Sequence, residues 1–334
     1  MNNERFWTSD EILMMVRAFQ PACVLVAAAE LDIFTVLNKR PMTAQTVANK
    51  LHCDRRAITI LLDALTALGF LTKQNNKYKI LPEIAEILTE KGIHNALPAV
   101  RHLGNCLARW AQLAKVTQTG QPAGRSASIS GAKADVAAFI GAMENFSTPI
   151  AAAIIDKLRP LTFHHLLDIG GASGTWTIEF LRAIPEATAT LFDLPDVIPI
   201  ARRHIKDAGF SSRIKLIAGN YYEDELPGGA DFAWLSAVAH QNSREQNREL
   251  FSKIYNALQK TGVLAIRDVV MDKSRTKPQT GALFAVNMLV STKGGGTYTF
   301  DEFREDLLQA GFKKVTLIHK DKAMNSLIRA KKVL

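Results

Sequence analysis

The stretch that decides the fold is His164–Leu181, HHLLDIGGASGTWTIEFL. A short apolar segment runs straight into glycines, and apolar residues then return at the spacing of a helix. A strand, a glycine turn and a helix in this order present backbone N–H groups at a helix N-terminus, where a ligand can bind. The stretch therefore predicts a ligand-binding turn at the start of an α/β domain.

Strand and helix patterns alternate from residue 161 to the end of the chain, which predicts an α/β domain over 161–334. The last two strands are joined by the short segment HKDKAM, so we expect this pair to be antiparallel in a mostly parallel sheet. The expected strands are 165–169, 189–192, 214–217, 232–235, 263–267, 314–318 and 325–330.

Residues 1–95 predict a separate, mainly α-helical domain. Thr43 and Asp54 are expected N-caps of a short and a longer helix, and the segment LTKQNNKYKIL predicts a hairpin. A helix, a turn, a longer helix and a hairpin make a winged helix. The preceding segment, 12–37, is apolar on more than one face and suits burial against a second subunit. Residues 96–160 predict a helical linker that is interrupted by a Gly/Ser/Pro-rich loop and ends at Pro160.

A winged helix raises the question of DNA binding. The expected recognition helix begins with Arg55 and Arg56, but then offers mostly small or acidic side chains such as Ala57 and Asp63. That face provides few contacts to phosphates or bases. We therefore expect a structural or dimerising domain and no nucleic-acid partner.

The composition is that of an ordinary soluble protein. The chain has 334 residues, of which 47% are hydrophobic and 22% charged, and its formal net charge of +9 is spread along the sequence. Three scattered cysteines do not form a disulfide framework or a zinc-binding pattern. Neither a signal peptide nor a membrane span is expected. These features favour a cytoplasmic protein with no membrane partner.

Two acidic residues indicate what the glycine turn holds. Asp168 precedes the turn, where a carboxylate would repel a pyrophosphate but can receive a bound ammonium group. Asp193 follows Gly174 by about 20 positions at the end of the next strand, where a ribose diol is bound in sheets of this kind. A nucleoside that carries an amino acid and no phosphate fits both positions. S-adenosylmethionine meets that description.

The stretch 170–174 and the segments FDLPDVI, GNYY and LSAVAH, in this order, resemble the class I S-adenosylmethionine-dependent O-methyltransferases of the plant caffeate and bacterial small-molecule type. The resemblance extends from about residue 15 to 330. It implies a Rossmann-like methyltransferase sheet, an N-terminal winged-helix domain that forms a homodimer, and a small-molecule methyl acceptor. The cofactor-binding residues it implies, together with the two acids above, are Asp168, Gly170, Gly171, Asp193, Leu194, Asn220, Tyr221 and Ser236.

The resemblance also implies a catalytic pair. His240 is similar to the family's general base, and Asp268 occupies the place of its first partner acid. This chain departs from the family at the two residues that follow, Gln241 and Asn242, where an acid and a tryptophan are usual. Thr297 stands where the second partner acid is expected. The pair therefore predicts methyl transfer to a hydroxyl, while the departures keep open an S-, N- or C-methyltransferase that relies on proximity.

The acceptor pocket is expected on two helices. Phe139 and Met143 are four residues apart, and Phe284, Asn287 and Met288 share a second helix face. Aromatic and methionine side chains suit a flat organic substrate, and Asn287 would orient a polar group on it.

Three further expectations complete the interpretation. The glycine run 294–296 predicts a flexible loop over the site. No cluster of acidic residues has the spacing of a divalent-metal site, so we expect no metal. An alternative from a different class is a winged-helix regulator whose C-terminal domain senses a ligand.

Overall fold

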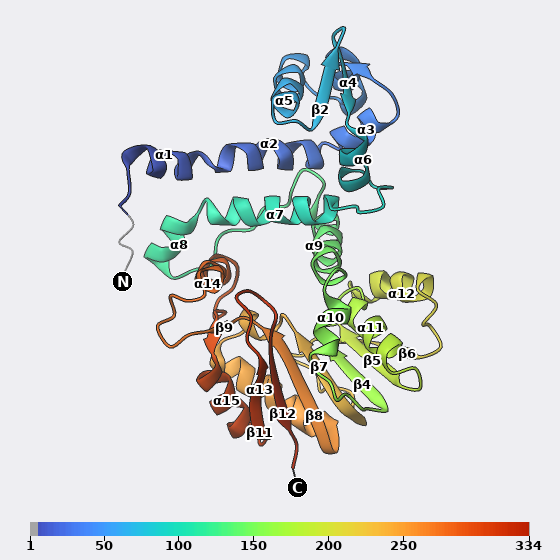
Figure 1. The fold of residues 1–334 in the computed structure, drawn as a ribbon, viewed down its shortest axis with the longest axis vertical. Coiled ribbons are helices and arrows are strands. Elements are labelled where there is room, and N and C mark those ends of the chain that lie inside the picture. The colour runs from blue at the N-terminus through green and yellow to red at the C-terminus, as the bar shows by residue number, and fades with distance from the viewer. Residues whose placement is uncertain (1–5, 334) are drawn as a thin grey trace. The chain divides into compact units, whose positions relative to one another are not determined.

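The computed structural model describes residues 6–333, which form two compact units. The first contains residues up to 107 together with 126–145, and the second contains 108–125 together with 146–333 (Figure 1). The predicted linker region, 96–160, is therefore shared between the two units. The helical segment before Pro160 is in two pieces, because Pro149 has no N–H to continue the helix. The two pieces are α9 (Ala132–Ser147) and α10 (Ala151–Asp156).

The first unit contains the expected winged-helix elements. Thr43 Oγ1 accepts a hydrogen bond from Thr46 N at 3.2 Å, and Asp54 Oδ1 accepts one from Ala57 N at 2.8 Å, so both predicted N-caps are present. The hairpin turns at Asn75 and Asn76, which both have positive φ. The elements are α1 (Ser9–Arg17), α2 (Phe19–Glu30), α3 (Ile33–Asn38), β1 (Met42–Thr43), α4 (Ala44–Leu51), α5 (Arg55–Ala67), β2 (Leu71–Gln74), β3 (Lys77–Ile80), α6 (Pro82–Leu88), α7 (Leu97–Trp110) and α9.

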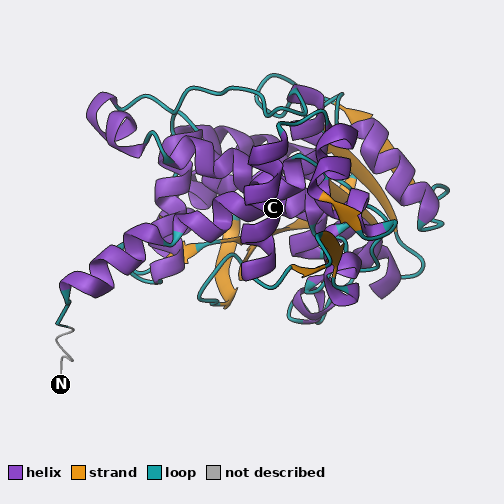
Figure 2. Ribbon diagram, turned by 90° about the horizontal axis from the view of Figure 1, so that it is seen from above, coloured by secondary structure: helices purple, strands orange, loops and turns teal. Residues whose placement is uncertain are grey.

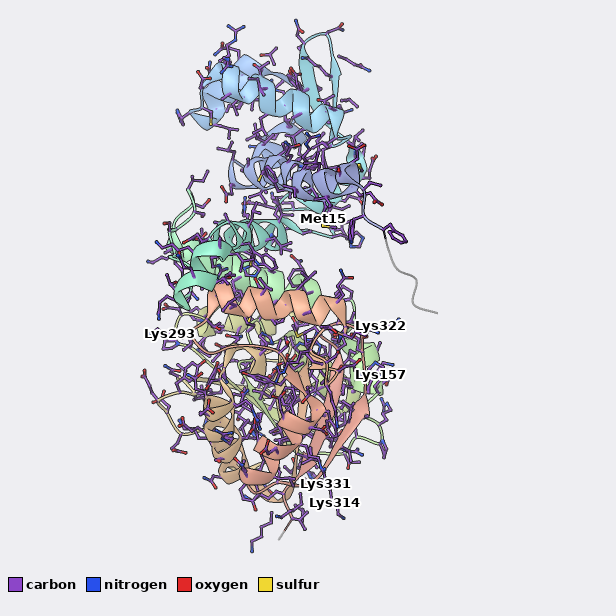
Figure 3. All side chains as sticks on the ribbon, turned by 90° about the vertical axis from the view of Figure 1, so that its left-hand side faces the viewer. Met15, Lys157, Lys293, Lys314, Lys322 and Lys331 are labelled. Atoms are coloured by element: carbon purple, nitrogen blue, oxygen red, sulfur yellow. The ribbon has the colours of Figure 1, made fainter. Side chains whose placement is uncertain are left out.

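The first two helices present many apolar side chains to solvent. None of the residues of α1 is buried, and Met15 projects from it (Figure 3). Within residues 6–333, one helical run, Ser9–Glu30, is long and apolar enough to cross a membrane, which differs from the expectation that no such segment exists. Length and composition are the only grounds for that finding, and core helices of soluble proteins meet the same criterion. The exposed apolar residues of this run are Ile12, Leu13, Met14, Met15, Val16 and Phe19.

The second unit is built on a seven-stranded sheet with the order β11-β12-β8-β7-β4-β5-β6. The strands lie among helices (Figure 2). Five strands are parallel, and β12 is antiparallel to both β8 and β11, as expected from the short last connection. The strands are β4 (His165–Ile169), β5 (Thr188–Asp193), β6 (Ile214–Ala218), β7 (Ala230–Ser236), β8 (Leu258–Asp268), β11 (Lys313–His319) and β12 (Ser326–Lys331).

Helices cover both faces of this sheet. One face packs on α10, α11 and α12, and the other packs on α13 and α15, each through an apolar cluster. Parallel strands buried on both faces are rich in apolar residues rather than alternating, which is why the strands could be recognised in the sequence. The remaining elements are α8 (Leu113–Thr119), α11 (Thr175–Ala183), α12 (Ile198–Asp207), the short 3₁₀ helix η1 (Ala239–Gln241), α13 (Arg244–Ala257), β9 (Val270–Met271), α14 (Gln279–Ser291), β10 (Tyr298–Thr299) and α15 (Phe300–Gln309).

The basic residues of the second unit are dispersed over its surface. Lys157, Lys293, Lys314, Lys322 and Lys331 are all exposed and lie at several places on the unit (Figure 3). In this unit the positive charge is thus not gathered at one labelled place, in keeping with its spread along the sequence.

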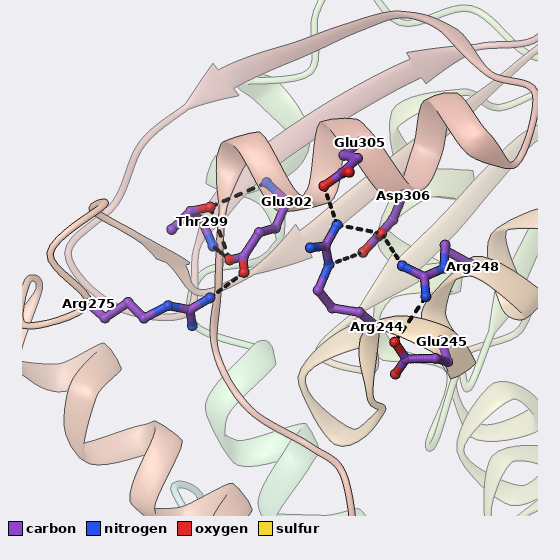
Figure 4. A network of polar contacts seen from close by, with 8 residues as sticks. All are labelled: Arg244, Glu245, Arg248, Arg275, Thr299, Glu302, Glu305 and Asp306. Atoms are coloured by element: carbon purple, nitrogen blue, oxygen red, sulfur yellow. Dashed lines mark hydrogen bonds and ion pairs between the residues drawn. The ribbon is translucent and has the colours of Figure 1, made fainter.

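An ion-pair network joins α13 to α15 (Figure 4). Arg244 contacts both carboxylate oxygens of Asp306, with Nε–Oδ2 at 3.0 Å and Nη2–Oδ1 at 2.7 Å, and Arg248 Nη1 lies 3.2 Å from Oδ1. Glu305 accepts a further hydrogen bond from Arg244 at 2.6 Å. These hydrogen bonds raise the pKa of Arg244. Asp306 is 3% exposed, so it is the buried centre of the network.

Replacing Asp306 with alanine should lower the free energy of unfolding by about 2–4 kcal/mol, because two guanidinium groups then lose their shared carboxylate. Glu305→Ala is the matched control: its side chain is 58% exposed, so the loss should stay below about 1 kcal/mol. Urea denaturation measures both values. Equal small losses would show that water screens the whole network.

Candidate functional site

The glycine turn joins β4 to α11 and is tightly packed. Gly170 N donates to Phe192 O at 2.8 Å, which ties the turn to β5. A Cβ at Gly171 would lie 2.6 Å from Leu191 Cγ and 3.1 Å from Asp168 Cγ, so only glycine fits there. Ala172 has a φ of 50°, an uncommon conformation for a residue with a side chain. The turn is therefore tightly held in place; that it binds a ligand stays a prediction from the sequence.

Asp168 places a carboxylate beneath this turn. It is 1% exposed, and its Oδ2 accepts a hydrogen bond from Thr177 Oγ1 of α11 at 2.6 Å. No ion pair found among residues 6–333 includes it. Burial, with a smaller contribution from the nearby Asp193, raises the pKa of Asp168 to about 7. A cation bound beside Asp168 would offset the effect of burial, lower the pKa of the carboxyl and favour its ionised form.

Asp193 is held at the end of β5 by two backbone groups. Its Oδ2 accepts from Ala172 N at 2.8 Å, and its Oδ1 accepts from Leu194 N at 2.7 Å. Burial raises the pKa of Asp193 although both hydrogen bonds oppose the change. The carboxylate is thereby fixed beside the glycine turn and retains lone pairs that a ribose diol could use. Leu194 follows it with an exposed apolar side chain.

The next turn, after β6, carries Asn220 and Tyr221. Asn220 Oδ1 accepts from Tyr222 N at 3.1 Å, so its amide nitrogen is the group left for a ligand. The rings of Tyr221 and Tyr222 lie 4.5 Å apart, and burial raises the pKa of Tyr221. Gly219 N donates to Asp193 O at 2.9 Å, which brings this turn next to the acid. These contacts suit the edge and face of a nucleobase.

Lys253 of α13 stabilises the same turn, and the sequence analysis did not identify it. Its ammonium group donates to the carbonyl oxygens of Tyr221 at 3.0 Å, Tyr222 at 3.2 Å and Asp224 at 2.9 Å. All three donors of the ammonium are used, so the turn cannot shift without losing them. No sequence signal marks a lysine some 30 residues away as the partner of this turn.

His240 and Asp268 are brought together at the ends of β7 and β8. His240 Nδ1 lies 2.9 Å from Asp268 Oδ1, and the backbone N–H groups of His240 and Val269 donate to the same carboxylate at 3.2 and 2.7 Å. A carboxylate only accepts, so Nδ1 carries the proton and Nε2 keeps its lone pair. His240 is 5% and Asp268 1% exposed. The arrangement can accept a proton at Nε2 and stabilise the imidazolium that forms.

The residues that depart from the family pattern have structural partners. Asn242 is fully buried, and its Oδ1 accepts from Tyr222 Oη at 2.5 Å while its Nδ2 donates to Asn247 at 3.1 Å. Asn247 in turn donates to Ala239 O at 2.9 Å. Amide hydrogen bonds therefore fix the loop that carries His240. Thr297 is buried, and its carbonyl oxygen accepts from Arg275 Nη1 at 3.0 Å.

The glycine run 294–296 lies in a loop, as predicted, and its backbone packs against the His240 loop. Gly296 N donates to His240 O at 2.9 Å. A Cβ at Gly295 would lie 2.6 Å from His240 O and 2.9 Å from Gln241 O. Close approach of the two backbones thus requires glycine at position 295, which composition alone does not reveal.

Gly295→Ala should therefore displace the backbone of His240 and lower the rate of catalysis by about 10-fold or more, with little effect on cofactor affinity. Gly296→Ala is the matched control, because a Cβ there has no neighbour closer than Tyr298 Oη at 4.0 Å. Steady-state kinetics and calorimetric titration separate the two effects. If both variants retained full activity, the Gly295 contact would not position His240.

The expected acceptor residues fall into two groups. On α14, the ring of Phe284 lies 4.7 Å from that of His240, and Asn287 Oδ1 accepts from Trp110 Nε1 at 2.9 Å. Met288 is buried on the same helix. Phe139 and Met143 lie on α9 in the first unit, where the Phe139 ring packs against His102 at 5.2 Å.

Within residues 6–333, no three His, Cys, Asp or Glu side chains are grouped so that they could hold a metal ion. The polar groups at the strand ends are instead backbone amides, two carboxylates that accept hydrogen bonds, and an amide side chain. This set suits a nucleoside with a charged amino-acid group, because it offers both hydrogen-bond acceptors for hydroxyls and a buried anion for an ammonium.

Comparison with known proteins decides the family. The family described as O-methyltransferase domain matches residues 112–313, and the O-methyltransferase dimerisation domain matches 15–89. The chain belongs to the O-methyltransferase family. It is thus an S-adenosylmethionine-dependent methyltransferase, and the resemblance drawn from the sequence is confirmed. The interpretation as a winged-helix regulator is set aside.

Several relatives of this methyltransferase share nearly its whole length. It is 28% identical to the tetracenomycin polyketide synthesis 8-O-methyl transferase of Streptomyces glaucescens, over 91% of each chain. It is 29% identical to the 3-hydroxy-5-methyl-1-naphthoate 3-O-methyltransferase of Streptomyces sahachiroi, over 88% of this chain and 86% of that protein. Other relatives are named as N,N- and C-methyltransferases. Human N-acetylserotonin methyltransferase, solved with S-adenosylmethionine, has the same fold, with a TM-score of 0.82 and 23% identity over all of both chains.

Proposed function

We propose that this methyltransferase transfers a methyl group to a hydroxyl of a small, flat organic molecule, with His240 as the general base and Asp268 as the group that orients it. The observation that carries the proposal is the 2.9 Å contact between His240 Nδ1 and Asp268 Oδ1, which leaves Nε2 as a proton acceptor. No other hydrogen bond to this ring was found among residues 6–333. Phe284, in edge-to-face contact with the His240 ring, places an apolar surface beside the imidazole.

When bound, S-adenosylmethionine supplies a methyl carbon that its sulfonium activates. The residues proposed to hold it are Asp168, Gly170, Gly171, Asp193, Leu194, Asn220, Tyr221 and Ser236. His240 Nε2 would take the proton of the acceptor hydroxyl as the methyl group passes from the sulfonium sulfur to the hydroxyl oxygen. Asp268 accepts the hydrogen bond from Nδ1 and stabilises the resulting imidazolium. The proton later leaves His240 for solvent, which restores the base.

The alternative is transfer to sulfur, nitrogen or carbon by the same fold. Gln241 and Thr297 stand where the family has acids, and an amine or thiolate needs less help from a base than a hydroxyl does. Proximity and alignment would then supply most of the rate. The relatives that carry N- and C-methyltransferase names keep this alternative in view.

A matched series of acceptors tests the proposal. The enzyme is incubated with S-adenosylmethionine carrying a labelled methyl group and with 1-naphthol, 1-naphthylamine or 1-naphthalenethiol, which differ only in the accepting atom. Faster transfer to naphthol supports a hydroxyl acceptor and justifies a wider search among hydroxylated aromatic acids and ketones. Transfer to the amine or thiol alone supports the alternative.

We also propose that the enzyme is a cytoplasmic homodimer. The chain carries a dimerisation domain, and the apolar side chains that α1 and α2 expose would be covered by a second copy. The proposed partners of the dimer are its cofactor and its small-molecule acceptor, with Phe139, Met143, Phe284, Asn287 and Met288 as acceptor contacts.

A further inference from the structure

Arg267 is a buried cation that none of the proposed steps uses. It lies near the end of β8 and is 5% exposed. Its guanidinium donates to Asn325 Oδ1 from Nε at 2.9 Å and from Nη2 at 2.7 Å, and to Ser236 Oγ from Nη1 at 3.0 Å. It also lies 4.8 Å from the ring centre of Trp176. All of these partners are neutral, and no ion pair found among residues 6–333 includes Arg267.

Burial without a counter-ion is costly for a guanidinium. The pKa of Arg267 is lowered to about 10 by burial, which outweighs the opposing influence of Asp268 and Asp321. The hydrogen bonds to Asn325 and Ser236 use three of its five N–H groups, so two remain for a ligand. A bound anion would satisfy them and supply the missing charge.

The strand register places Arg267 on the same face of the sheet as Asp168. Arg267 is paired with Ser236, and Trp234, two residues before Ser236, is paired with Asp168. Side chains two residues apart on a strand, and side chains paired across parallel strands, point to one face. That face is covered by α11. The buried cation and the buried anion therefore lie under the same helix.

Two consecutive residues of α11 connect these charges. Trp176 lies against the Arg267 guanidinium, and Thr177 donates to Asp168 at 2.6 Å. Both belong to the first turn of the helix that follows the glycine turn. Arg267 and Asp168 are not paired with each other in any ion pair found within residues 6–333. Two unpaired charges of opposite sign, at one end of a nucleoside site, complement a zwitterion.

We propose that Arg267 binds the carboxylate of the amino-acid group of S-adenosylmethionine, while Asp168 receives its ammonium. This inference rests on the proposed cofactor site and adds a residue to it. Asn325 and Trp176 hold the guanidinium in place before the ligand arrives, so its side chain loses little conformational freedom on binding. Ser236 is then an orienting partner of Arg267 as well as a neighbour of the cofactor.

Calorimetric titration with two probes tests this assignment. S-adenosylhomocysteine carries the whole amino-acid group, and decarboxylated S-adenosylhomocysteine keeps the ammonium but lacks the carboxylate. Arg267→Met should weaken the binding of S-adenosylhomocysteine by about 30-fold or more and leave the binding of its decarboxylated form nearly unchanged. Arg267→Lys keeps the charge but not the planar guanidinium. Its affinity for S-adenosylhomocysteine should therefore fall by less, and its affinity for the decarboxylated form should again be nearly unchanged.

A structural arginine provides the control. Arg213, just before β6, donates to the carbonyl oxygens of Leu181, Ile184 and Ala187 and lies over Phe210. Arg213→Met should not change the ratio of the two affinities. If Arg267→Met does not fold, Arg267→Lys and the wild-type protein still give that ratio.

If Arg267→Met lost affinity equally for both probes, or lost none for S-adenosylhomocysteine, the assignment of Arg267 would be overturned. A wild-type protein that binds neither probe would instead overturn the cofactor site itself. The titration contains no methyl acceptor, so a wrong choice of His240 as base would leave every one of these results unchanged.

Discussion

His240→Ala should lower the rate of methyl transfer to a hydroxyl by about 100- to 10,000-fold, because the acceptor then keeps its proton as the methyl group arrives. Affinity for S-adenosylmethionine should change little, since no hydrogen bond or ion pair found within residues 6–333 joins His240 to the residues assigned to the cofactor. Rapid-quench or steady-state assays with the hydroxyl acceptor found in the naphthol series measure the first quantity, and calorimetry measures the second.

Two further variants locate the origin of that loss. Asp268→Asn retains the shape of the partner but presents an amide to His240 Nδ1, so the wrong tautomer becomes available and the rate should fall substantially. Gln241→Ala is the control, because the Gln241 side chain donates to Ala237 O and not to the pair. A loss smaller than about 10-fold in His240→Ala would favour an acceptor that carries no proton to be removed.

Asp193→Ala should reduce the affinity for S-adenosylmethionine by about 100-fold or more, because two charge-assisted hydrogen bonds to the ribose are lost. The hydrogen bonds from Ala172 N and Leu194 N fix the carboxylate in advance, so the wild-type protein binds without reorganising it. The same substitution also removes acceptors for these two N–H groups. Asp193→Asn retains one side-chain oxygen, so its affinity for S-adenosylmethionine should lie between those of Asp193→Ala and the wild-type protein.

Asp196→Ala is the matched control for this prediction, since Asp196 is an exposed acid in the same segment. Calorimetric titration of the three variants with S-adenosylmethionine gives the comparison. Equal affinities of the Asp193 and Asp196 variants would remove Asp193 from the site. Loss of binding together with loss of the folded state, detected by thermal unfolding, would mark the hydrogen bonds of Asp193 as structural instead.

The sequence predicts the sheet well because its signals are local. Strand patterns, the caps at Thr43 and Asp54 and the turn at 170–174 depend on residues a few positions apart, and each is present in the structure. Asp168 and Asp193 could be chosen because each stands at the end of a strand, and in a parallel sheet such ends lie along one edge.

The rest of the site depends on contacts between distant segments. Lys253 stabilises the Tyr221 turn from another helix, and Arg267 lies under α11 only because the register of β7 and β8 puts it there. Trp110 and Asn287 are 177 positions apart. The glycine run 294–296 gives no sign in the sequence of the close contact that Gly295 makes with the His240 backbone, which only the neighbouring atoms show. No pattern in one sequence encodes these pairings.

The buried carboxyl of Asp168 has a consequence for proton balance. With a pKa of about 7, it is largely protonated in the free enzyme at pH 6, whereas a bound ammonium favours the carboxylate. Cofactor binding at pH 6 should therefore release a proton to the buffer, and affinity should rise as the pH increases through 7 and then level off. Titrations at pH 6 in buffers of different ionisation enthalpy should give different heats, and equal heats would contradict this coupling. Each loading of the enzyme would then be an exchange of one cation for another: a proton leaves Asp168 as the ammonium enters.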